Sequence, residues 1–119
     1  MRFNKAIAGY HMLMILSEVD GHFDAYEKRL IGEYIKFSFP VPIDLDTENQ
    51  ALATLPKELY MEHFLKVAND FYWDSNPAER NLFIKFAYTL ARADRKISRE
   101  ENSFIEALYV QWDIQPDEA

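Results

Sequence analysis

Four carboxylate residues are the first candidates for chemistry in this chain, because their types and spacing repeat. Asp20 and Glu27 recur as Asp94 and Glu101, with an offset of 74 residues for both pairs. Hard cations such as Ca²⁺ and Mg²⁺ bind several carboxylate oxygens. If the two segments pack as related units, the four side chains would approach one another. The repeat therefore predicts a divalent-cation site (Ca²⁺ or Mg²⁺), and no other cofactor is expected.

A calcium-binding EF-hand is excluded at both copies. Such a loop needs an oxygen ligand at its first position. Counting back from Asp20 and Asp94 places Leu16 and Leu90 there, and neither side chain carries an oxygen. The two basic residues that follow Asp94 would also weaken any cation site in the second copy.

A purely structural role is the competing interpretation of the same carboxylates. Asp24 and Ser98 precede Glu27 and Glu101 by three residues, which is the spacing of a capping box. In that motif the cap side chain and the glutamate satisfy backbone N–H groups at the start of a helix. The two aspartates of the repeat would then only close the preceding helices. Both interpretations stay open at this point.

The repeat also predicts the architecture. We expect a single all-α domain over residues 1–119 with about six helices. Two pseudo-symmetric helix-turn-helix units, at about 3–37 and 77–112, are joined by the segment 38–76. No window alternates polar and apolar residues over the length of a strand, so no sheet is expected.

Local signals place several helices inside this frame. The first helix is expected to have one apolar face, and the second to end before Pro40. A short helix is expected from Thr47. The segment Asn76-Pro77-Ala78-Glu79 predicts a helix start, with a cap, a proline at the first position and a glutamate at the third. Phe71-Tyr72-Trp73 spans more than one helical face, which indicates at least one ring at the surface or an interface. The preferred interpretation places all three rings in the core or at its rim, because aromatic side chains commonly bury most of their area.

The second copy, Leu90-Ala91-Arg92-Ala93-Asp94-Arg95-Lys96-Ile97-Ser98-Arg99-Glu100-Glu101, resembles the tellurite-resistance TerB-like family. That family includes the related N-terminal domain of a DnaJ-type membrane co-chaperone. The chain departs from its pattern at Val19, where alanine is usual, and at Arg95, where glycine is usual. The resemblance implies an all-α fold, a stress-response or envelope-associated bacterial system, and metal binding by the acidic residues of the motif. The positions that match those acidic residues are Asp20, Glu27, Asp94 and Glu101.

No group of residues suggests catalysis. The chain has no cysteine and only three glycines, which argues against a thiol nucleophile and a phosphate-cradling loop. His11, His22 and His63 show no metal-ligand spacing. We interpret His11 and His63 as ordinary helix or rim residues, and we expect the protein not to be an enzyme.

The net charge of −7 argues against nucleic acid and anionic membranes as partners, because their phosphates attract Lys and Arg. No apolar run has transmembrane length. The N-terminal apolar stretch soon meets acidic residues, so we interpret it as a mature helix of a cytoplasmic protein. Together these features predict a non-catalytic domain that binds a partner protein or a divalent cation. The alternative is an unrelated small helical adaptor with purely structural capping carboxylates.

Overall fold

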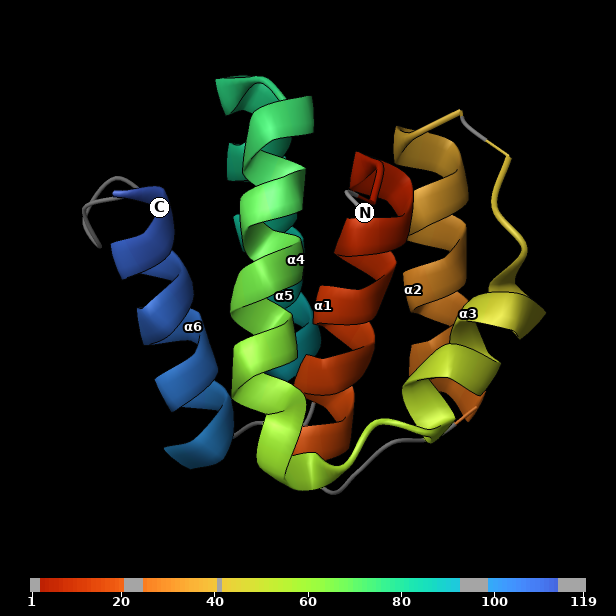
Figure 1. Ribbon diagram of the computed structural model, residues 1–119. Helices are drawn as coiled ribbons and strands as arrows, with labels where there is room; N and C mark the ends of the chain where they lie inside the picture. The colour runs from red at the N-terminus through yellow and green to blue at the C-terminus, as the bar shows by residue number, and fades with distance from the viewer. Residues whose placement is uncertain (1–2, 21–24, 41, 93–98, 114–119) are drawn as a thin grey trace.

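Helices form every regular element in the part of the chain that the structure describes. The computed structural model describes residues 3–20, 25–40, 42–92 and 99–113. Its elements are α1 (Lys5–Asp20), α2 (Ala25–Ser38), α3 (Leu45–Ala53), the short 3₁₀ helix η1 (Lys57–Leu59), α4 (Tyr60–Asp74), α5 (Pro77–Arg92) and α6 (Arg99–Trp112). The predicted all-α bundle of about six helices is confirmed (Figure 1). No helix within these ranges is long and apolar enough to cross a bilayer.

The central helix of the bundle is α1. Figure 1 shows it between α2 and α4, and it also contacts α3, α5 and α6. A helix with neighbours on several sides must be apolar nearly all round. Residues 8–17 are accordingly buried without interruption. Tyr10, Leu13, Met14 and Leu16 of the predicted apolar face are buried, and burial also extends to the other sides of α1 along this stretch.

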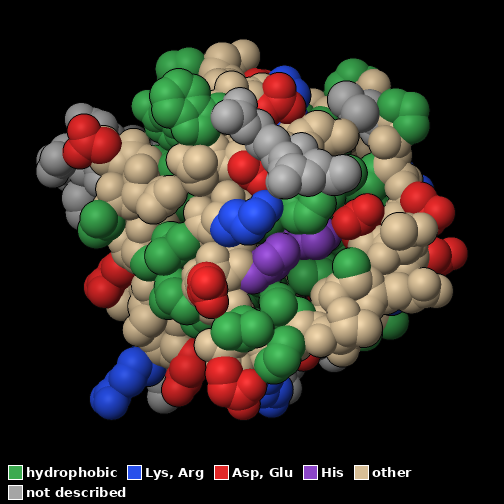
Figure 2. Space-filling model, in the orientation of Figure 1, with side chains coloured by type: hydrophobic (Ala, Val, Ile, Leu, Met, Phe, Trp, Pro, Cys, Tyr) green, Lys and Arg blue, Asp and Glu red, His purple; other side chains and the backbone are tan. Residues whose placement is uncertain are grey.

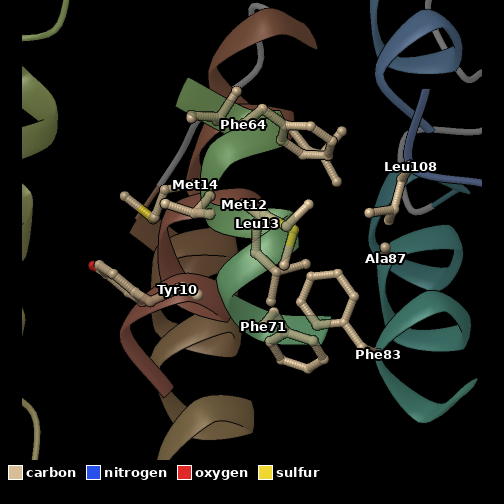
Figure 3. Packing of buried hydrophobic residues seen from close by; sticks show 14 of the residues in the cluster. Tyr10, Met12, Leu13, Met14, Phe64, Phe71, Phe83, Ala87 and Leu108 are labelled. Atoms are coloured by element: carbon tan, nitrogen blue, oxygen red, sulfur yellow. The ribbon is translucent and has the colours of Figure 1, made fainter. Parts of the chain in front are cut away.

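Side chains from both sides of α1 build the core. Figure 3 shows Leu13 facing Phe71 of α4 and Phe83 of α5, whereas Tyr10 and Met14 point to the other side of α1. All five side chains are buried. The ring centroids of Phe71 and Phe83 lie 4.9 Å apart, a separation typical of aromatic pairs in protein cores.

Gly9 allows α1 to approach its neighbours closely. A Cβ atom at this position would lie 3.2 Å from Cδ1 of Ile35 on α2 and 3.3 Å from Cε2 of Phe71 on α4. Both distances are shorter than an ordinary van der Waals contact between carbon atoms. The absence of a side chain therefore brings three helices together at one level of the bundle.

Capping residues define two helix starts. Asn76 Oδ1 accepts a hydrogen bond from the Glu79 N–H at 2.8 Å, and Glu79 Oε1 accepts one from the Asn76 N–H at 3.0 Å. The predicted capping box of α5 is confirmed. The short helix α3 starts at Leu45 rather than Thr47, because Asp44 is its cap and accepts hydrogen bonds from two N–H groups of its first turn.

The aromatic triplet at the end of α4 divides between core and surface. Phe71 is fully buried, Tyr72 is half-buried, and Trp73 is 64% exposed. The exposed Trp73 agrees with the expectation of at least one ring at the surface, whereas the preferred interpretation, with all three rings in the core or at its rim, is wrong. Three consecutive residues of a helix span about 200° around its axis, so they cannot all face one core.

Candidate functional site

Glu27 and Glu101 occupy the same position in their helices. Each is the third residue, in α2 and α6 respectively, and their exposed fractions are only 7% and 3%. Both helices begin directly after the predicted cap residues, which themselves lie outside the described ranges. The third position of a helix is where the glutamate of a capping box belongs.

The other two carboxylates of the repeat are only partly described. Asp20 is the last residue of α1, but its side chain and the whole of Asp94 lie outside the described residues. Among the side chains that the structure describes, no three acidic or histidine groups are arranged to hold a metal ion. The four-carboxylate cation site therefore stays a prediction.

A hydrogen-bonded chain of three side chains links α4, α1 and α3. Nδ1 of His11 lies 2.9 Å from Nε2 of His63, and Nε2 of His11 lies 2.7 Å from Oε1 of Glu48. His11 is 2% exposed, whereas His63 and Glu48 are half-buried. We call His63, His11 and Glu48 the histidine chain.

The carboxylate fixes the direction of its hydrogen bond with His11, and for neutral imidazoles the direction of the second hydrogen bond follows. A carboxylate only accepts, so Nε2 of His11 must carry the proton that it donates to Glu48. A neutral His11 then has a lone pair on Nδ1, which accepts from the N–H at Nε2 of His63. A neutral His63 is left with a lone pair on its outer nitrogen, Nδ1. Within the described residues this atom has no hydrogen-bond partner.

Both histidines have a pKa below the ordinary value for imidazole. Burial lowers the pKa of His11 and outweighs the Glu48 carboxylate, which acts in the opposite direction. Burial also lowers the pKa of His63, and the neighbouring His11 and Lys66 lower it further, against a smaller opposing effect of Asp70. A pKa lowered from about 6.5 favours the neutral form of both rings at pH 7, and neutral rings fit the hydrogen-bond pattern described above.

Phe3 covers the two imidazoles. Its ring centroid lies 5.2 Å from that of His11 and 6.3 Å from that of His63. Its backbone N–H donates to Oδ2 of Asp70 at 3.1 Å, which holds the segment before α1 against α4. Nζ of Lys66 lies 4.7 Å from the Phe3 ring centroid and 3.4 Å from the same oxygen of Asp70. The Phe3 ring excludes water from one side of the histidine chain, which strengthens the hydrogen bonds between its members.

The histidine chain does not have the geometry of a metal site. Zinc ligands direct one lone pair each to a common point at about 2.0–2.1 Å from nitrogen. His11 instead directs its two nitrogens to two different partners, and the 2.9 Å gap to His63 is too short for an ion between the rings. The arrangement is suited to proton transfer: a proton that leaves Nε2 of His63 can pass to His11, whose positive charge Glu48 then stabilises.

The sequence did not reveal the histidine chain. A rim position is wrong for His11, which is buried and hydrogen-bonded at both nitrogens, whereas the half-buried His63 agrees with the interpretation as a rim residue. The three residues come from three helices, so no spacing in the sequence connects them. One signal was available: His11 interrupts an apolar stretch, and a buried polar side chain needs hydrogen-bond partners.

A second candidate is an exposed aromatic hollow between α2 and α5. It is lined by Leu30, Glu33, Tyr34, Lys36, Phe37 and Phe86, which we call the aromatic surface. The rings of Tyr34 and Phe86 stack at a centroid distance of 4.2 Å and an interplanar angle of 4°. Phe37 is 92% exposed, and Tyr26 and Leu82 on the same two helices are also exposed.

The comparisons with known proteins do not identify a relative. No protein-family model, no curated protein and no solved structure matches this chain. The TerB-like resemblance therefore remains a prediction from the motif residues.

Proposed function

We propose that this chain is a non-catalytic binding domain that docks an amphipathic helix of a partner protein on the aromatic surface. The observation that carries the proposal is Phe37, which is 92% exposed beside an apolar hollow. Fully burying a phenylalanine contributes about 1.5–3 kcal/mol. Aromatic side chains grouped in this way are typical anchors of protein interfaces.

The shape of the aromatic surface favours a helix as its occupant. The hollow lies between two helices, α2 and α5, which meet through the stacked rings of Tyr34 and Phe86. Tyr26, Leu30 and Phe37 are spaced by four and seven residues and therefore share a stripe of α2. An apolar stripe between two helices matches the apolar face of a third helix.

Charges around the aromatic surface favour acidic residues on that partner helix. Two of the local carboxylates already have basic partners: Glu33 lies 3.2 Å from Arg29, and Glu79 lies 2.7 Å from Lys5. Within the described residues Lys36, the lysine that lines the hollow, forms no ion pair. Charges are screened beyond about 8 Å at physiological salt. Lys36 therefore influences a docked helix more than the net charge of the molecule does.

A second copy of this chain is disfavoured as the occupant. A symmetric contact would bring Lys36 of one aromatic surface towards Lys36 of the other. Two chains of net charge −7 also repel one another as they approach. A partner helix with apolar residues and flanking Asp or Glu avoids the repulsion between lysines, and its binding does not require two copies of this chain to approach one another. We propose that this partner belongs to a stress-response or envelope-associated system, as the TerB-like resemblance implies.

Divalent-cation binding by the repeat carboxylates is the second candidate function. The observation in its favour is that Glu27 and Glu101 are both buried at equivalent helix positions. Buried carboxylates need compensating interactions. The capping of α2 and α6 supplies a structural explanation for the same burial, so cation binding ranks second.

Two synthetic helical peptides test the docking proposal. They share the same leucine and phenylalanine positions and differ only in their flanking residues, which are glutamates in one and lysines in the other. We expect the acidic peptide to bind more tightly by fluorescence anisotropy. Phe37→Ser should weaken that binding by about thirtyfold, which corresponds to about 2 kcal/mol for an interface anchor.

Val110→Ser is the matched control, because Val110 is 82% exposed but lies on α6, away from the hollow. It should leave the affinity for the acidic peptide unchanged. Tighter binding of the basic peptide, or equal losses in the two variants, would contradict the proposal. A dimer detected by sedimentation and abolished by Phe37→Ser would show that a second copy is the occupant instead.

A further inference from the structure

We propose that Nδ1 of His63 is a phosphoryl-acceptor site, and that His11 and Glu48 take up the proton released from the same ring. The donor class is a small acyl phosphate. The inference rests on the geometry of the histidine chain and is independent of the aromatic surface, which lies on other helices.

The outer nitrogen of His63 has the properties of a nucleophile. With both imidazoles neutral and His11 donating to Glu48, this atom keeps a lone pair, and it has no hydrogen-bond partner in the described part of the chain. Figure 2 shows histidine surface in the middle of one face of the molecule, next to a basic side chain. His11 is almost fully buried, so this surface belongs mainly to His63. A small reagent from solution can therefore reach the ring.

The transfer step balances without any further reactant. The Nδ1 lone pair of His63 forms the N–P bond, while the P–O bond to the acyl group breaks and the carboxylate leaves with the electron pair. The proton at Nε2 of His63 moves across the 2.9 Å hydrogen bond to Nδ1 of His11. His11 becomes an imidazolium ion whose charge Glu48 stabilises at 2.7 Å. The imidazole ring of the phosphorylated His63 is thus left without a positive charge. His11 acts here as a positioned base, as bases do beside other side-chain nucleophiles.

The described charges near His63 come from three helices. On α4, Lys66 lies one turn after His63 and its charge acts on both imidazoles. Asp70 on the same helix already accepts from the Phe3 N–H and contacts Lys66. His11 and Glu48 complete the set from α1 and α3. Lys66 is the cation of this group, and it would lie beside the charge that a phosphoryl group brings, which favours phosphoryl over neutral acyl transfer.

Acetyl phosphate tests the site, because it offers both a phosphoryl and an acetyl group. The folded protein is incubated with it at neutral pH, and the labelled peptides are identified by mass spectrometry under alkaline conditions. ³¹P NMR then distinguishes the two ring nitrogens. We expect phosphorylation of His63 at Nδ1, at a rate at least tenfold above that of the same residue in urea-unfolded protein, because a positioned base contributes about 10²–10⁴-fold to such steps.

Two variants complete the test. His63→Gln should abolish the fast label, and Glu48→Gln should slow it by about tenfold or more while a melting curve shows an intact fold. If Glu48→Gln fails to fold, the comparison of native and unfolded wild-type protein decides alone. Equal rates in native and unfolded protein, a label at Nε2, or transfer of acetyl instead of phosphoryl would each overturn the proposal.

Discussion

At the scale of single residues, the histidine chain is the feature that depends most on the folded structure. His11 lies in the middle of the central helix, where a polar side chain is costly unless it is bonded. Its two nitrogens find partners on two other helices, at 2.9 and 2.7 Å. The same contacts that satisfy a buried ring also connect a surface imidazole to a carboxylate. The contacts that stabilise the buried ring are therefore the same ones on which the proposed reactivity of His63 depends.

Acidification should destabilise the protein between about pH 6.5 and pH 5. Both histidines have a folded-state pKa that is lowered, mainly by burial. The unfolded chain therefore binds more protons in this range, and stability is fully present above about pH 6.5 and is lost as pH falls, as linkage requires. The free energy of unfolding, measured with urea at several pH values, should decrease accordingly.

His63→Gln is the control for this pH dependence. It removes one of the two titrating rings, so the slope of stability against pH should become smaller in the same window. Most carboxylates titrate near pH 4 and contribute below it. Stability that rises on acidification from pH 6.5 to 5 would show that the ion pair between His11 and Glu48 outweighs burial, contrary to this account.

At the scale of secondary-structure elements, helix starts were the most predictable features. Asn76 and Glu79 form the hydrogen bonds that their spacing predicts, because a capping box depends only on residues within one turn. The helix α3 starts at Leu45, two residues before the predicted start at Thr47. The reason is that Asp44, not Thr47, is the cap and accepts hydrogen bonds from the N–H groups of the first turn. Local competition of this kind is difficult to decide from sequence.

Asn76→Ala should destabilise the protein by about 1 kcal/mol, because the Glu79 N–H loses its acceptor. Urea denaturation measures this change. Asn81→Ala is the matched control, since Asn81 is exposed on the same helix and alanine is the better helix former. A midpoint for Asn76→Ala that equals that of the control would mean that the cap contributes nothing.

The helix pairs that carry the repeat give a test of the cation hypothesis. If the carboxylates of the repeat bind a divalent ion, millimolar Ca²⁺ or Mg²⁺ should raise the melting temperature, because the ion binds only the folded state. Asp20→Asn combined with Asp94→Asn should remove this response and leave the helices folded. Identical melting curves in divalent salt and in monovalent salt of matched ionic strength would count against the site and favour a capping role.

At the scale of the whole molecule, the sequence predicted what depends on local pattern and missed what depends on packing. Apolar periodicity and caps were sufficient for an all-α bundle of about six helices. They did not show that α1 is surrounded, because helix neighbours are set by the tertiary arrangement. The histidine chain was missed for the same reason, as its members lie on three helices.

The aromatic surface was only partly predictable. The sequence suggested an exposed ring in Phe71-Tyr72-Trp73, and Trp73 is indeed exposed. The larger apolar exposure is at Phe37, on α2, where it joins Phe86 from a helix distant in sequence. Exposure of this kind appears only when two helices are placed side by side. It is also the basis of the central claim, that α2 and α5 form a docking site for a partner helix.

The most direct test of that claim is a ¹H–¹⁵N NMR titration of the wild-type protein with the acidic helical peptide. We predict that the largest shifts fall on amides around Leu30–Phe37 in α2 and Leu82–Phe86 in α5, with little change in α6. The same titration with Phe37→Ser should produce shifts only at much higher peptide concentration. Largest shifts on other helices, or no saturable shifts at all, would contradict the docking claim.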